Sequence, residues 1–189
     1  MLKYEDKLYI VSNTSGVFVY SKNARHPDQI FNRSVNPGFF TRIKAYNSSL
    51  YVSSTYGIYQ SSVNSTDWVK LKTFESYDTS ITDFILNDSG MYIVTNKNAV
   101  LYSSDCGRNW DSRNNGLPGF GGFSSIVLSM NNVFLGTYGD GVYYSFDSGL
   151  HWLQYNNGMG NLSIGSMELC SNTLFAGTFG SGLWMRELK

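Results

Sequence analysis

Short runs of alternating apolar and polar residues, separated by polar turns, extend along the whole chain. Four of them follow one another at 124–130, 132–137, 141–145 and 151–155. Alternation with a period of two is typical of half-buried β-strands, and the Asn-Asn and Gly-Asp-Gly breaks between the runs are typical of hairpin turns. The pattern therefore predicts antiparallel hairpins rather than strands connected by helices.

This four-strand pattern recurs along the chain. An apolar pair that follows a polar turn returns about every 42 residues, at Leu8-Tyr9, Leu50-Tyr51, Met91-Tyr92, Val133-Phe134 and Leu174-Phe175. A four-stranded antiparallel unit with this period is typical of a β-propeller blade. We therefore expect an all-β fold, a single β-propeller domain over residues 1–189 with about five blades. In each blade the strands are called A to D from the inner edge outward.

The expected repeats are 1–41, 42–80, 81–122, 123–163 and 164–189. The first four contain all four strands, and the last contains strands A, B and C. Because the chain begins in strand A and ends in strand C, neither end offers a strand that completes the last blade. We expect the ring to close through packing of blade 5 against blade 1, which predicts a monomer. The residues expected in or near that seam are Leu8, Tyr9, Leu174 and Phe175. The alternative is an open arc that covers its exposed blade faces by forming a homo-oligomer.

Two loops between strands C and D share the pattern Ser-x-Asp-x-Gly-x-x-Trp. The copies consist of Ser103, Asp105, Gly107 and Trp110, and of Ser145, Asp147, Gly149 and Trp152. An Asp side chain can accept hydrogen bonds from the N–H groups of its own turn, Gly can adopt a positive φ, and Trp can bury a large ring. A catalytic motif is needed once, so the duplication favours a structural role at a hairpin corner. A degraded copy at 61–68 keeps Ser61 and Trp68 but has Val63 and Ser65 in place of Asp and Gly.

These motifs resemble the Asp-box repeats, also called BNR repeats, of sialidase-like, sortilin-like and photosystem-assembly-factor-like propellers. Through its period the resemblance covers essentially the whole chain. It implies that the Asp-box loops lie on the face opposite the ligand. The loops between strands B and C, and between strand D and the next strand A, are then the candidates for function.

Three B–C loops carry an aromatic residue at equivalent positions, namely Tyr56, Tyr138 and Phe179. Asp140 belongs to the same loop as Tyr138. The D–A loops add Phe39, Phe40, Glu75, Tyr77, Asp78, Phe120 and Phe123. Aromatic rings beside Asn, Asp and Gly suit stacking on sugar rings or holding a partner's loop. Each ring could instead pack between adjacent blades, but as a set they predict a site for a carbohydrate or protein ligand, with Tyr56, Tyr138, Asp140, Phe179 and Phe120 as candidate residues.

A glycoside hydrolase, or a fragment of one, is the alternative. Resemblance to the sialidases implies three arginines that hold a carboxylate, a Tyr–Glu nucleophile pair and an Asp acid. Of the arginines, Arg33 and Arg42 are expected near the ligand face, so this triad cannot be assembled. Glu75, Asp78 and Asp140 could supply a pair of carboxylates, although solvated loop carboxylates are the simpler interpretation. We therefore expect a non-catalytic binding or scaffold module.

The charge balance and the cysteine content of the chain restrict the classes of partner and cofactor that it could bind. The formal net charge is zero, with 14 basic and 14 acidic residues, which disfavours nucleic acid and anionic membranes as partners. Cys106 and Cys170 lack metal-ligand spacing, so neither a zinc site nor another cofactor is expected, and both thiols should be free. Residues 1–20 lack the features of a secretion signal. The chain is then either cytosolic or a piece of a longer protein, for example a secreted or surface protein.

Overall fold

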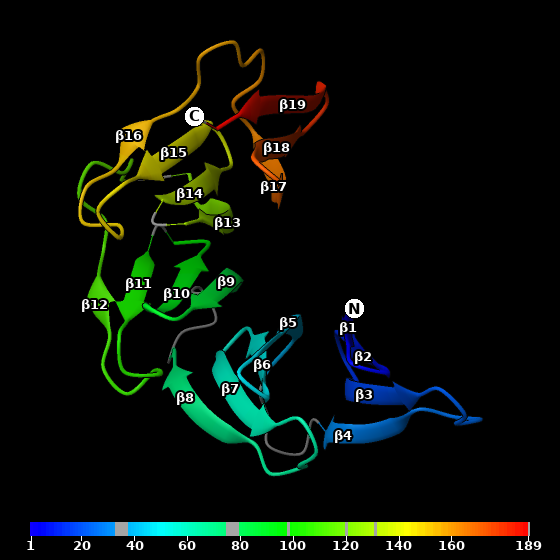
Figure 1. Cartoon of the computed structure of the whole chain (residues 1–189). Coiled ribbons are helices and arrows are strands. Elements are labelled where there is room, and N and C mark those ends of the chain that lie inside the picture. The colour runs from blue at the N-terminus through cyan, green and yellow to red at the C-terminus, as the bar shows by residue number, and fades with distance from the viewer. Residues whose placement is uncertain (33–37, 75–79, 98, 120, 131, 189) are drawn as a thin grey trace. The chain divides into compact units, whose positions relative to one another are not determined.

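The computed structural model describes six stretches of the chain, residues 1–32, 38–74, 80–97, 99–119, 121–130 and 132–188. Strands and turns make up these stretches. The strands form five antiparallel sheets in chain order, with four, four, four, four and three strands (Figure 1). Each sheet is one blade, and the predicted all-β, five-bladed organisation with a three-stranded last blade is confirmed.

The strands of each blade follow one another along the chain. Blade 1 contains β1 (Leu2–Tyr4), β2 (Lys7–Ser12), β3 (Gly16–Ser21) and β4 (Asp28–Asn32). Blade 2 contains β5 (Phe40–Tyr46), β6 (Ser49–Ser54), β7 (Gly57–Ser62) and β8 (Val69–Thr73). Blade 3 contains β9 (Ile81–Asn87), β10 (Gly90–Thr95), β11 (Val100–Ser103) and β12 (Asp111–Ser112).

The last two blades repeat this order. Blade 4 contains β13 (Phe123–Ser129), β14 (Asn132–Thr137), β15 (Val142–Ser145) and β16 (Leu153–Gln154). Blade 5 contains β17 (Ile164–Cys170), β18 (Thr173–Thr178) and β19 (Gly182–Glu187). The expected fourth strand at 151–155 is thus reduced to two residues. None of the described segments forms a helix long and apolar enough to cross a membrane.

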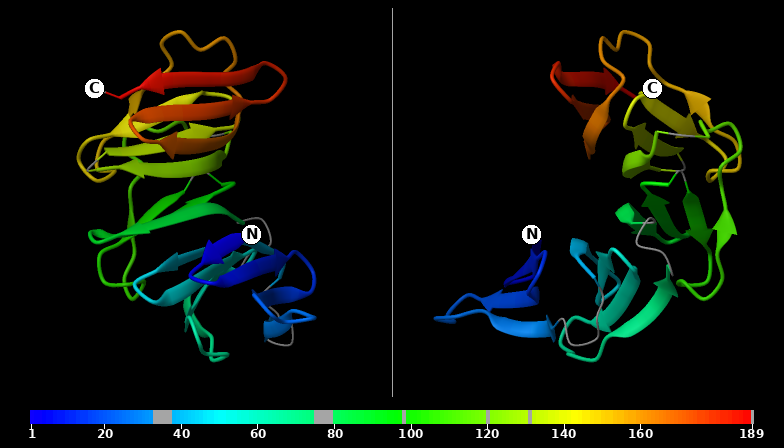
Figure 2. Two further views of the ribbon diagram at one scale, coloured as in Figure 1. Left: turned by 45° about the vertical axis from the view of Figure 1, so that its right-hand side comes forward. Right: turned by 180° about the vertical axis from the view of Figure 1, so that it is seen from behind.

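The chain divides into two compact units, Met1–Ile81 and Thr82–Lys189. Blades 1 and 2 belong to the first unit, and blades 3 to 5 belong to the second apart from Ile81. Within each blade the strands lie side by side in order, as further views show (Figure 2).

Blade 4 shows why the apolar pattern is so dense. Successive residues of a strand point to opposite faces of the sheet. Val133 and Leu135 of β14 pack in a core cluster with residues of blade 3, whereas Phe134 packs in a second cluster with residues of blade 5. Both faces of the sheet are therefore buried, and a strand of this kind reads as a nearly continuous apolar run.

Several residues lie deeper than the sequence indicated. Phe40 and Phe123, expected in D–A loops, begin β5 and β13 and are buried. Tyr9 and Leu174, expected in or near a closing seam, are fully buried in the cores of the first and second unit, respectively. Ring closure itself stays a prediction.

Candidate functional site

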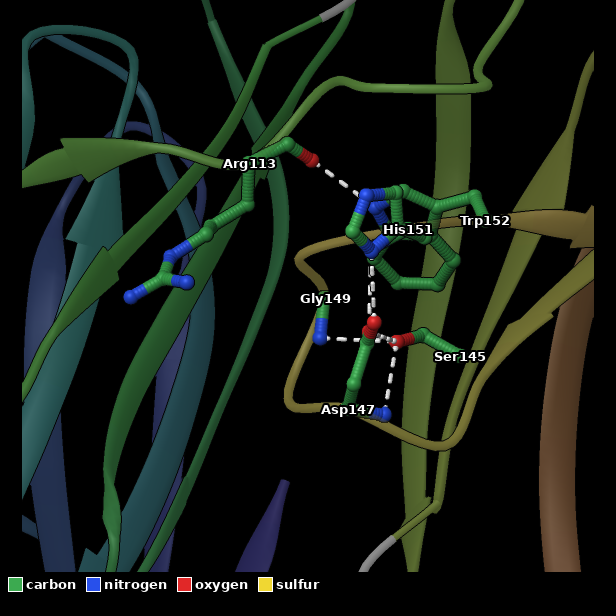
Figure 3. Close-up of polar contacts among 6 residues, drawn as sticks. All are labelled: Arg113, Ser145, Asp147, Gly149, His151 and Trp152. Carbon is green, nitrogen blue, oxygen red and sulfur yellow. Dashed lines mark hydrogen bonds and ion pairs between the residues drawn. The ribbon is translucent and has the colours of Figure 1, made fainter.

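The Ser-x-Asp-x-Gly-x-x-Trp loop of blade 4, residues 145–152, forms a compact corner between β15 and β16 (Figure 3). The hydroxyl of Ser145 donates to Oδ1 of Asp147 at 2.7 Å and accepts the N–H of Gly149 at 2.8 Å. Oδ1 of Asp147 also accepts the N–H of His151 at 2.9 Å. Gly149 has a φ of +83°, a conformation in which a side chain is strained. One serine and one aspartate thus satisfy the polar groups of the turn.

The matching loop of blade 3, residues 103–110, repeats this arrangement. Ser103 donates to Oδ1 of Asp105 at 2.8 Å and accepts the N–H of Gly107 at 2.8 Å. Oδ1 of Asp105 accepts the N–H groups of Arg108 and Asn109, at 3.0 and 2.8 Å. Gly107 again has a positive φ of +89°.

The residue before each tryptophan adds a bond that the motif does not specify. Nδ2 of Asn109 donates to Oδ2 of Asp105 at 2.7 Å, and Nδ1 of His151 lies 2.7 Å from Oδ2 of Asp147. The His151 side chain is 67% exposed, so it acts as a polar partner of the carboxylate rather than as a packed ring. The sequence pointed to packing of His151 at this corner and did not indicate the bond to the aspartate, because Asn and His look unrelated at this position.

These bonds lower the pKa of both carboxyl groups. The N–H of Asn109, its side-chain amide and the Ser103 hydroxyl lower the pKa of Asp105 from 3.8 to about 2. Burial acts to raise the pKa of Asp147. The N–H of His151, the Ser145 hydroxyl and the His151 ring outweigh burial and lower that pKa to about 2 as well. Carboxylates engaged in their own turns are poorly placed to act on a ligand.

The motif tryptophans differ in what they contact. Trp152 is buried, and its Nε1 donates to the carbonyl of Arg113 in blade 3 at 2.8 Å (Figure 3). Trp68 of the degraded copy likewise donates to Ile30 of blade 1 at 2.8 Å. Trp110 is half-buried and donates to Gly107 of its own loop at 2.9 Å. Trp152 and Trp68 therefore link consecutive blades inside their units.

The B–C loops of blades 4 and 5 present two aromatic side chains. Tyr138 follows β14 and is 42% exposed, and Phe179 follows β18 and is 59% exposed. Their ring centroids lie 6.3 Å apart with a 40° angle between the planes. Gly141 and Gly182, each with a φ of +80°, return the chain into the next strand. The repeat thus brings two predicted site residues together on neighbouring blades.

The segment between β16 and β17 holds both loops in place. Ser163 forms a β-bridge with Tyr138, and its carbonyl accepts the N–H of Phe179 at 2.9 Å. Nδ2 of Asn161 donates to the carbonyl of Phe179 at 2.6 Å and to the hydroxyl of Ser181 at 3.1 Å. The backbone under the two rings is therefore fixed while the rings stay accessible.

Each of the three predicted B–C loop aromatic residues, Tyr56, Tyr138 and Phe179, lies against a glycine at the start of its own blade. A Cβ atom on Gly122 would lie 3.2 Å from Cδ2 of Tyr138, and one on Gly165 would lie 3.2 Å from Cε2 of Phe179. In the first unit, a Cβ on Gly38 would lie 2.7 Å from Cδ2 of Tyr56. Tyr56 is half-buried, so it offers less surface than the other two rings.

The remaining predicted residues are placed as follows. Asp140 is half-buried beside Gly121, and its carbonyl accepts a hydrogen bond from Nδ2 of Asn156 at 2.9 Å. Phe39 is 47% exposed. Residues that lie outside the described part of the chain are Arg33, Glu75, Tyr77, Asp78 and Phe120.

Metal and thiol chemistry gain no support from the described residues. Within them, no group of three or more His, Cys, Asp or Glu side chains could hold a metal ion. Cys106 and Cys170 are both free and exposed. Neither thiol belongs to a cluster of metal-binding side chains among the described residues.

Comparison with known proteins identifies the fold of this chain but not its activity. No protein-family model and no curated protein sequence matches this chain. The structure of YCF48 bound to D1 peptide matches with a TM-score of 0.73 at 15% identity, over 98% of this chain and 62% of that one. The extracellular domain of BT4673 from B. thetaiotaomicron matches with a TM-score of 0.75 at 14% identity, over 96% of this chain and 26% of that one. An ancestral GH74 enzyme matches with a TM-score of 0.69 at 17% identity, over 90% of this chain and 25% of that one. This chain spans less than two thirds of each of these structures, and it shares their β-propeller fold.

Proposed function

We propose that this β-propeller is a non-catalytic binding module and that Tyr138 and Phe179 form the centre of its binding surface. The observation that carries the proposal is the pairing of two exposed rings, 6.3 Å apart, on loops whose backbone is already fixed. Large exposed rings on a rigid support lose little conformational entropy when they bind. Such rings are typical anchors of a binding surface.

The ligand is a protein or a carbohydrate. Aromatic rings stack on the apolar faces of sugars and pack against apolar side chains. A Cβ on Gly139 or on Gly180 would meet no atom within 4 Å, so a ligand can approach the backbone at both loop tips. The half-buried Asp140 follows Gly139 and offers a carboxylate acceptor. The bound peptide named for the YCF48 structure supports a protein ligand.

The test is a parallel screen of a glycan array and a peptide library, followed by variants of the aromatic pair. We expect the double variant Tyr138→Ala/Phe179→Ala to lose at least about thirtyfold in affinity, because a single aromatic anchor contributes about 2 kcal/mol or more. Phe146→Ala is the matched control, since Phe146 is 62% exposed but belongs to the Asp-box loop of blade 4. Equal affinity of the double variant and wild type would overturn the assignment of the surface.

A glycoside hydrolase is the rival function, and it needs two carboxylates on either side of a sugar bond. Of the three candidates, Asp140 lies in the described part of the chain, whereas Glu75 and Asp78 do not. The likeness to a GH74 enzyme at 17% identity supports the fold alone. Hydrolysis of a chromogenic glycoside by wild type, abolished in Asp140→Asn, would overturn the binding-module proposal.

A further inference from the structure

A cavity of about 480 Å³ lies between the outer strands of blades 1 and 2, within the first unit. Its volume falls in the range of pockets that hold small molecules. Aromatic residues Phe31, Tyr59 and Trp68 and polar residues Gln29, Thr66 and Lys70 line it. None of these residues belongs to the aromatic surface of blades 4 and 5.

The aromatic wall of this cavity is rigid. The indole of Trp68 stacks on Phe31 with centroids 4.7 Å apart and 11° between the planes, and Tyr59 meets Phe31 edge-on at 5.2 Å. Nε1 of Trp68 donates to the carbonyl of Ile30 at 2.8 Å, which fixes the orientation of the ring. Phe31 and Tyr59 are buried, whereas Trp68 is half-buried. Phe31 covers one face of the indole, and the half-buried ring lines the cavity.

The rim of the cavity is polar and carries a positive charge. Lys70 is exposed, and its Nζ lies 5.9 Å from the centre of the Tyr59 ring. Among the described residues that line the cavity, Lys70 is the one with a charged side chain. Thr66 adds an exposed hydroxyl. Gln29 adds an amide that is held by a 2.6 Å bond from its Nε2 to the carbonyl of Ser15.

The degraded Asp-box explains why space is left here. Thr66 stands two residues before Trp68, where the complete copies have the longer Arg108 and Leu150. Val63 replaces the Asp and is buried. The loop is closed instead by hydroxyl bonds, among them Ser61 to the carbonyl of Ser65 at 3.3 Å. The substitutions that weaken the motif thus leave a short side chain beside an accessible tryptophan.

We propose that this cavity binds a pyranose ring that carries a carboxylate, as a uronic acid does. The C–H face of the sugar would stack on Trp68, and the carboxylate would pair with Lys70. The ring hydroxyls would bond to Thr66 and Gln29. An aromatic acid would leave the hydroxyl and the amide without ligand partners, and a neutral sugar would leave the ammonium group without one. The site is independent of the proposed surface on blades 4 and 5.

The test follows the indole N–H signal of Trp68 by NMR, assigned with Trp68→Phe, during titration with glucuronate or galacturonate. We expect a saturable shift of this signal in wild type. Lys70→Met should weaken binding about two- to fivefold, because an ion pair at an exposed side chain contributes up to about 1 kcal/mol. Thr66→Leu, which restores the residue of blade 4, removes the hydroxyl and narrows the cavity, so it should weaken binding and reduce the shift. Lys22→Met removes one lysine of blade 1 that does not line this cavity and should bind like wild type.

Three outcomes would overturn the proposal. The first is the absence of a saturable shift in wild type with either uronate. The second is binding of glucose as tight as that of glucuronate, which would exclude a role for the Lys70 charge. The third is binding of benzoate as tight as that of the uronates, which would make the ligand an aromatic acid rather than a sugar. Signal dispersion in the rest of the spectrum reports whether each variant is folded.

Discussion

Asp105 and Asp147 show how one ionised side chain can stand in for several backbone partners. Each accepts a serine hydroxyl and a backbone N–H on Oδ1, and a side chain of the following turn on Oδ2. Asn109 and His151 both bond to Oδ2 of their aspartate, the first through an amide and the second through an imidazole nitrogen. The motif could be predicted from sequence as a structural corner because it is duplicated, but the side chain that bonds to Oδ2 could not, because it occupies a variable position.

Removal of the Asp147 carboxylate should destabilise the fold. We expect Asp147→Ala to lower the free energy of unfolding by about 1–2 kcal/mol, because the N–H of His151 and the Ser145 hydroxyl lose their acceptor. Asp105→Ala should act in the same direction. Urea unfolding measures the effect, and Asp111→Ala, at a side chain that is 78% exposed, is the control with a change within about 0.5 kcal/mol. Loss of ligand affinity with unchanged stability would contradict the structural role.

The lowered pKa of Asp147 predicts a pH dependence of stability. The pKa is about 2 in the folded chain against 3.8 for the unperturbed group, so the unfolded chain binds protons first as the pH falls. The contribution of the carboxylate is therefore complete above about pH 5 and is lost progressively as the pH falls through 3.8 towards 2. The partly exposed site is screened by solvent, which keeps the effect small.

Comparison with Asp147→Asn isolates this group, since the amide does not titrate. The difference in unfolding free energy between wild type and variant should shrink as the pH is lowered from about 5 to about 2. Urea unfolding at a series of pH values measures it. A difference that stays constant over this range would show that the carboxylate charge contributes nothing to stability.

At the level of strands, the inner strands of the second unit are connected across blades by side chains. Oδ2 of Asp83 in β9 accepts the N–H of Ile126 at 3.2 Å and the hydroxyl of Ser125 at 3.3 Å. The hydroxyl of Ser125 in turn accepts the N–H of Met167 in β17 at 3.2 Å. These bonds link blade 3 to blade 4 and blade 4 to blade 5 at their inner edges.

Two neighbouring serines test that connection. Ser124 and Ser125 are both buried, but within the described structure the hydroxyl of Ser124 has no hydrogen-bond partner. We expect Ser125→Ala to cost about 1–3 kcal/mol, since it leaves Met167 N–H unpaired. Ser124→Ala should change stability by less than about 0.5 kcal/mol or increase it. Equal losses in thermal unfolding would refute the proposed link between inner strands.

The sequence predicted the strands well where alternation and period agree, and less well beside the motif. β14 at Asn132–Thr137 lies where it was expected. The expected strand 151–155 is shorter because its first N–H groups bond elsewhere. The N–H of His151 goes to Asp147, and that of Trp152 goes to the carbonyl of Asn115 at 3.0 Å. The alternation of apolar and polar residues does not indicate that these N–H groups bond outside the strand.

The candidate sites differ in how well they could be predicted from the sequence. Tyr138 and Phe179 could be named because equivalent positions in consecutive repeats fall on the same corner of neighbouring blades. The cavity beside Trp68 could not be named, because it depends on the gap between strands of two blades and on the short side chain of Thr66. The local pattern likewise could not separate the buried Phe40 from the exposed Phe39.

At the scale of the whole molecule, the exposed surface of blade 5 bears on the state of assembly. One face of β19 contributes Trp184 to the cluster shared with blade 4, and the other face carries Leu183 and Met185, which are 65% and 67% exposed. β19 is also an outer strand of the three-stranded sheet. Apolar side chains along an edge strand favour association with another surface.

This exposed apolar face favours the homo-oligomer, which is the alternative to the predicted closed monomer, so we expect the chain to self-associate as its concentration rises. Met185→Glu should weaken this association, because it places a charge on the apolar face of β19. Met130→Glu is the matched control, since Met130 is 90% exposed just before β14 and outside that face, and it should associate like wild type. Sedimentation velocity over a range of concentrations measures the change. A wild type that stays monomeric throughout would contradict self-association and favour ring closure, and Met185→Glu should then lower the stability of the monomer instead.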